Sequence, residues 1–153
     1  MKAHSRLPTG VWIIISVFVV FAFFWVVGQG GAVVSYDRVA ELGFHSERAH
    51  VDPITILVTQ AIAIGDVLIQ LPFFLVAIFG LWRLRFYGVA AAWIALGINL
   101  YWTTVAWAKQ FYYLKAGVDT EPFGFALHAQ LAFVFLFSVW ASWYLYKNRT
   151  SFD

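Results

Sequence analysis

Four long stretches of apolar residues constrain this chain more than any other feature of its sequence. A helix needs about 20 mostly apolar residues to cross the hydrocarbon core of a bilayer. These stretches cover residues 11–34, 54–82, 87–111 and 125–146. They predict an all-α fold, a four-transmembrane-helix bundle that forms a single integral membrane domain over residues 1–153.

The charge content supports this class, because only 12% of the residues are charged whereas soluble domains carry about 25%. A soluble enzyme and a nucleic-acid binder are therefore excluded. We expect a multi-pass protein of a bacterial inner membrane, or of the endoplasmic reticulum membrane in a eukaryote. The chain has no Cys, and His45, Glu47 and His50 lack the spacing of a ligand motif, so neither a metal nor a cofactor is predicted.

The distribution of charge predicts the orientation. Basic residues concentrate near both termini and in the Arg83–Arg85 turn, whereas acidic residues such as Asp37, Asp52 and Asp119 occupy the other two connections. Since basic loops favour the cytoplasm, both termini are expected there. The first stretch is too long for a signal peptide and is expected to be a retained helix.

Two polar side chains in the second and third stretches are predicted to lie at the same depth. With a rise of about 1.5 Å per residue, Asp66 and Asn99 each lie roughly 18 Å from the end at which their helix enters the membrane. Polar groups at this depth are costly and usually face a bundle interior or a cavity. We therefore expect Asp66 and Asn99 to form the floor of a pocket, with a hydrogen bond between them.

Helical spacing adds further residues to this predicted pocket. Gln70 follows Asp66 by four positions, and Trp102 follows Asn99 by three, so each pair shares a face. Asp52 precedes Pro53 in a pattern typical of a helix start. Lys109 is expected to extend toward the interface or to contribute to the pocket rim. The remaining rim candidates lie in the outer half of the bilayer: Gln29, Gln60 and His128.

A short motif in the second stretch resembles a known family. Residues 66–74 read Asp-Val-Leu-Ile-Gln-Leu-Pro-Phe-Phe, which is similar to the second-span signature of the sigma-2 receptor and its relatives in the EXPERA superfamily. The Asp52-Pro53 pair and the Leu127-His128 pair resemble further elements of that family. The group also includes the emopamil-binding protein, a sterol isomerase.

The resemblance implies a lipid-accessible pocket for sterols or amphipathic amines. It makes Asp66 the buried acid of the pocket, Gln70 its neighbour and Asp52 an acid that braces the pocket mouth. The sigma-2 receptor has a second acid late in its first span, but this chain has Gln29 near that position and its closest acid is Asp37.

Three functions follow as expectations. The first is binding of a membrane lipid or a sterol-like, hydrophobic or amphipathic ligand around Asp66. The second is isomerisation of a sterol or isoprenoid double bond, with Asp66 and His128 as the acid and base. The third is a structural role as an accessory subunit of a larger membrane complex. The sequence does not decide whether the chain works alone, as a homodimer or with a membrane partner.

Overall fold

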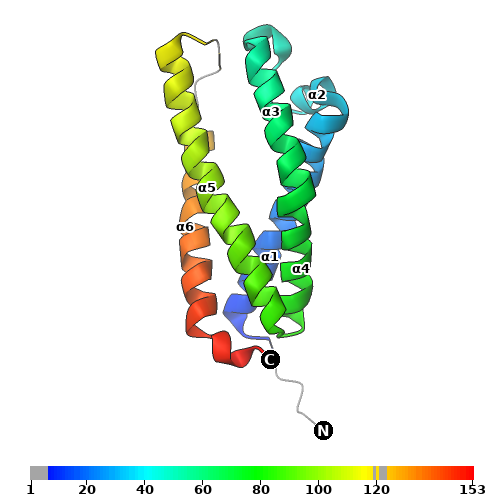
Figure 1. The fold of residues 1–153 in the computed structure, drawn as a ribbon, viewed down its shortest axis with the longest axis vertical. Helices are drawn as coiled ribbons and strands as arrows, with labels where there is room; N and C mark the ends of the chain where they lie inside the picture. Colours follow the sequence, from blue (N-terminus) through cyan, green and yellow to red (C-terminus); the bar gives the residue numbers. More distant parts are fainter. Residues whose placement is uncertain (1–6, 119, 121–123) are drawn as a thin grey trace.

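The computed structural model describes residues 7–118, 120 and 124–153, and every regular element in these ranges is helical (Figure 1). Four of the helical stretches are long and apolar enough to cross a membrane: Thr9–Glu41, Pro53–Trp82, Phe86–Ala116 and Phe125–Lys147. The predicted all-α, four-transmembrane-helix bundle is therefore confirmed, and the chain is a multi-pass membrane protein.

Several of these stretches consist of more than one element. The elements in chain order are α1 (Thr9–Phe24), η1 (Trp25–Gly30), α2 (Gly31–Glu41), η2 (Arg48–His50), α3 (Pro53–Gly65), η3 (Asp66–Gln70), α4 (Leu71–Trp82), α5 (Phe86–Ala116), α6 (Phe125–Lys147) and η4 (Arg149–Ser151).

The helices extend beyond the predicted spans where polar residues continue the helical backbone. The first stretch runs to Glu41, with a kink at Ser35, where the backbone leaves helical geometry. The third runs to Ala116 and ends at Gly117, whose φ of 67° is typical of a glycine that stops a helix. The apolar stretches therefore predict which parts of these helices suit hydrocarbon, but they do not predict where the helices end.

One end of the bundle is tightly packed. α4 and α5 cross at Gly80 and Gly88, and a Cβ atom on either glycine would collide with the backbone of the other helix. Small residues allow such close approach between membrane helices. Next to this crossing, α1 and α6 pack around a core that includes Phe18, Phe74 and Leu145.

The C-terminus belongs to the same end. Asp153 donates a backbone hydrogen bond to Leu84 (3.0 Å) and accepts one from Phe86 (2.8 Å), so the chain end pairs with the turn between α4 and α5. The basic residues of this turn and of the C-terminus therefore share one end of the molecule. Lys2, Arg6, Asp119 and Glu121 lie outside the described residues. The cytoplasmic location of the termini stays a prediction.

The helices separate toward the opposite end. Figure 1 shows α5 and α6 diverging from α2 and α3, so that the molecule has the outline of a V. The two arms are joined mainly through contacts between α4 and α5 at the tightly packed end, the closed end of the V, with fewer contacts between α1 and α6. This divergence positions the cavity described below.

Two π-helical segments, η1 and η3, contact each other where the arms begin to separate. In η3, the backbone N–H of Leu71 donates to the carbonyl of Asp66, five residues back. Pro72 follows directly and has no N–H of its own, and its ring disfavours a regular α-helical turn before it. The structure accommodates this proline with a π turn, a feature often found at functional sites.

Candidate functional site: an intramembrane cleft

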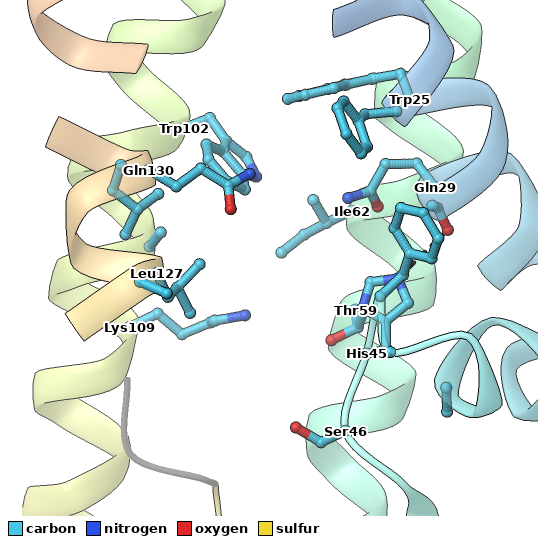
Figure 2. A pocket seen from close by; sticks show the side chains of 18 of the residues that line it. Trp25, Gln29, His45, Ser46, Thr59, Ile62, Trp102, Lys109, Leu127 and Gln130 are labelled. Atoms are coloured by element: carbon cyan, nitrogen blue, oxygen red, sulfur yellow. Dashed lines mark hydrogen bonds between the residues drawn. The ribbon is translucent and has the colours of Figure 1, made fainter. Parts of the chain in front are cut away.

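A cleft of about 850 Å³ lies between the two arms of the molecule. Figure 2 shows its two walls. Trp25, Gln29, His45, Thr59 and Ile62 lie on the wall built by η1, α3 and the segment after α2, and the facing wall of α5 and α6 carries Trp102, Lys109, Leu127 and Gln130.

The inner end of the cleft is aromatic. Trp25 and Trp102 approach each other from opposite walls, with ring centroids 5.8 Å apart and an edge-to-face angle of 63°. Phe74 packs against Trp25 from the core side at 5.9 Å. Ile62 and Leu131 complete this apolar region. Such rings present a large apolar surface with a fixed geometry, which suits a hydrocarbon ligand.

A buried polar cluster lies one helical turn deeper than this aromatic end. Trp25 Nε1 donates to Gln70 Oε1 at 3.1 Å, and Gln70 Nε2 donates to Asn99 Oδ1 at 2.5 Å. Gln70 is 1% exposed and Asn99 is fully buried. Three separate helical stretches are therefore joined by one chain of hydrogen bonds. Such bonds contribute about 0.6 kcal/mol each on average in a membrane protein.

Asp66 belongs to this cluster but does not bond to Asn99, so the predicted hydrogen bond between them is wrong. Gln70 occupies the position between the two helices instead. Asp66 is 7% exposed and interacts with the Trp25 side chain. Its Oδ2 atom and the Nδ2 atom of Asn99 have no hydrogen-bond partner among the described residues. These two atoms can therefore form further hydrogen bonds.

The floor of the cleft consequently differs from the prediction. Trp25 and Trp102 close the cleft, whereas Asp66 and Asn99 are not among its lining residues. Sequence reasoning missed Trp25, although the signal was present. Trp25 precedes Gln29 by four positions, so a helix that directs Gln29 toward the site directs Trp25 there as well.

Polar groups gather toward the outer end of the cleft, where a second cavity of about 310 Å³ adjoins it. His45, Ser46, Thr59 and Lys109 line both cavities. Lys109 points across the cleft, as Figure 2 shows, rather than along the helix toward the interface. Its Nζ lies 5.8 Å from the ring centroid of Tyr113.

His45 is held in place from two sides. Its Nε2 atom lies 3.3 Å from the carbonyl oxygen of Gly28, and its ring stacks on Tyr36 with centroids 5.5 Å apart. Burial lowers the pKa of His45 below its ordinary value of 6.5, and the positive charge of Lys109 lowers it further, although the bond to Gly28 acts in the opposite direction. The neutral imidazole is therefore favoured in this wall of the cleft.

Two other predicted site residues, Gln60 and Asp52, do not line the cleft. Gln60 Nε2 donates to the carbonyl of Ala32 at 3.2 Å and is not a lining residue. Asp52 accepts a hydrogen bond from the backbone of Ile54 at 2.9 Å, which confirms it as the cap of α3. Of the predicted set, Gln29 and Trp102 line the cleft, and Asp66, Gln70 and Asn99 come together behind it.

His128 lies outside the cleft and is exposed. Its Nδ1 atom accepts a hydrogen bond from Trp107 Nε1 at 3.1 Å. Gln130 lines the cleft instead. Side chains two positions apart on a helix, such as those of His128 and Gln130, point in nearly opposite directions, because each residue turns the helix by about 100°. The structure therefore does not bring His128 together with Asp66, the partner that an acid–base pair requires.

Within the described part of the chain, no group of three or more His, Asp or Glu side chains could hold a metal ion. The fold and the cleft define a four-span membrane protein with an internal cavity. The sequence matches no family model, and comparisons with curated proteins and with solved structures find no match either.

Proposed function

We propose that this protein binds a membrane lipid or a sterol-like molecule in the cleft, with the aromatic end against the apolar part of the ligand. The observation that supports this most is the cleft itself. Its volume of about 850 Å³ falls within the range of about 300–1,000 Å³ of small-molecule sites, and apolar and polar regions occupy its opposite ends. A hydrophobic or amphipathic ligand matches that division.

Asp66 has an indirect role in this proposal. Its carboxyl interacts with Trp25, and Gln70 accepts the indole N–H, so these two buried residues hold one of the rings that touches the ligand. A polar ligand group that reached past Trp25 would also meet the open hydrogen-bonding positions of Asp66 and Asn99.

Two substitutions test the proposal. Trp102→Ala removes an aromatic ring from one cleft wall. It should weaken saturable binding of a cholesterol analogue by about tenfold or more, because truncation of an aromatic hot spot costs about 2 kcal/mol or more. Asp66→Asn should weaken it less, while the protein remains folded in detergent.

Trp143→Ala is the matched control, because Trp143 is 57% exposed and does not line the cleft. Mass spectrometry of lipids retained through purification provides an independent measurement. Equal binding by all three variants and the unmodified protein would exclude the cleft as the site.

Among the other expected functions, no observation favours isomerisation, since His128 is bonded to Trp107 outside the cleft. Binding without chemistry is therefore the function that we propose. As part of the same proposal, the buried Asp66 and Gln70 ahead of Pro72 support kinship with the sigma-2 receptor and its relatives.

A further inference from the structure

Lys109 is the feature of the cleft that the proposed function leaves unexplained. It lies where the two cavities meet, and it is the one Lys or Arg among the described residues that line them. No carboxylate of the described residues is within ion-pair distance of its Nζ atom. An ammonium group removed from water is costly unless it is paired, so this position favours a negative partner.

The acidic residues near the cleft do not supply that partner. Glu47 is the one acid among the described lining residues, and its side chain is 65% exposed and lies 3.9 Å from His50. Asp66 is one turn deeper, behind Trp25. Asp52 is engaged as the cap of α3. Asp52 lies close enough to act electrostatically on Tyr113, but neither it nor Glu47 forms an ion pair with Lys109.

Hydroxyl groups surround the same position. Thr55, Thr59, Tyr113 and Thr120 line the smaller cavity together with Lys109. The Oγ1 atom of Thr55 is buried and has no partner among the described residues. A hydroxyl can donate to an anion, and a hydrogen bond to a charged group is stronger than one between neutral groups. The outer cavity therefore combines a cation with neutral donors, which is the composition of an anion site.

We propose that the ligand is an amphiphile with an anionic head group, a carboxylate or a phosphate, which binds Lys109 while its apolar chain lies against Trp25 and Trp102. This inference rests on the proposed function and names its ligand class. Lys109 follows Trp102 by seven positions on α5, which places the head group about 10 Å from the aromatic end.

The test compares oleate and lysophosphatidate with two chain-matched probes, oleyl alcohol and oleylamine, on purified protein in nanodiscs of neutral lipid. Both anionic probes should bind about tenfold tighter than the alcohol. Lys109→Gln should abolish that difference, because it should weaken binding of both anionic probes much more than binding of the alcohol. Lys115→Gln is the control, because Lys115 is exposed, lies on the same helix and does not line either cavity.

A second measurement needs no substitution at Lys109. Nuclear magnetic resonance of the His45 ring should show its pKa rising when oleate binds, since an anion offsets the repulsion from Lys109. Oleyl alcohol should leave the pKa unchanged. The charged and titratable groups around His45 are Lys109 and Tyr113 on the facing wall, Tyr36, which stacks on the ring, and Glu47 and His50 in its own segment.

Each outcome decides one of the two proposals. If neither the oleyl probes nor the cholesterol analogue binds, the proposed function fails and this inference fails with it. If the cholesterol analogue binds but the anionic probes do not, only this inference fails. If oleate and the alcohol bind equally, or if oleylamine binds most tightly, the cleft still binds ligands but the anionic head group is refuted. Displacement of oleate by inorganic phosphate alone, at similar concentration, would show that the chain is unnecessary and would also refute the amphiphile.

Discussion

The hydrogen-bond chain through Gln70 should stabilise the fold by a measurable amount. Gln70→Met keeps the side-chain volume but removes the bonds to Trp25 and Asn99, which join separate helical stretches. Hydrogen bonds between membrane helices average about 0.6 kcal/mol and reach about 1.7 kcal/mol, so losing two should lower the free energy of unfolding by about 1–3 kcal/mol. Reversible unfolding in mixed detergent micelles, followed by circular dichroism, measures this loss.

A double-mutant cycle isolates the bond to Trp25. Trp25→Phe keeps an aromatic ring but removes the indole N–H, so Trp25→Phe and Gln70→Met together should show a coupling of about 0.6 kcal/mol or more. Ser138→Ala is the matched control, because the buried hydroxyl of Ser138 bonds within its own helix, to Val134 at 2.7 Å. A coupling below about 0.3 kcal/mol, the usual error of additivity, would refute the claim that this bond stabilises the junction of the two arms.

Two further predictions concern packing and pH. Gly88→Ala should destabilise the protein by about 1–3 kcal/mol, because the added methyl group meets the backbone at Gly80. Gly97→Ala should not destabilise it, because Gly97 has open space around it, and thermal unfolding in detergent compares the two variants. Since the pKa of His45 is lower in the fold than its ordinary 6.5, the unfolded chain takes up the proton first, and stability should fall as the pH drops below about 6.5 toward the folded pKa. His45→Gln should reduce that dependence, and an unchanged pH profile would contradict it.

The fold was predictable because apolar length is a strong signal. Hydrocarbon admits few structures other than helices, so the four apolar stretches predicted four spans without any knowledge of packing. The polar residues in these stretches were informative for the same reason. Asp66, Gln70 and Asn99 are buried together, as the cost of exposing them to lipid requires.

Which polar side chains form hydrogen bonds with each other was less predictable, because this depends on local departures from the α-helix. In η3, the backbone bond spans five residues instead of four, which changes the direction of the following side chains relative to a regular helix. Spacing rules derived from an α-helix therefore identified Gln70 as a neighbour of Asp66 but did not predict that it would take the bond to Asn99. The segment containing His45 carries no periodic signal, so its place in the cleft wall depended on tertiary packing.

A small change in the angle at which α4 and α5 cross at Gly80 and Gly88 would produce a larger displacement at the far end of α5. Lys109 lies 21 residues beyond Gly88 on α5, a distance of about 32 Å along the helix axis. A tilt of about 5° at the crossing would move Lys109 by about 3 Å, if the helix remained rigid over that length. The packing at Gly80 and Gly88 therefore helps to set the width of the open end, although neither glycine lines the cleft.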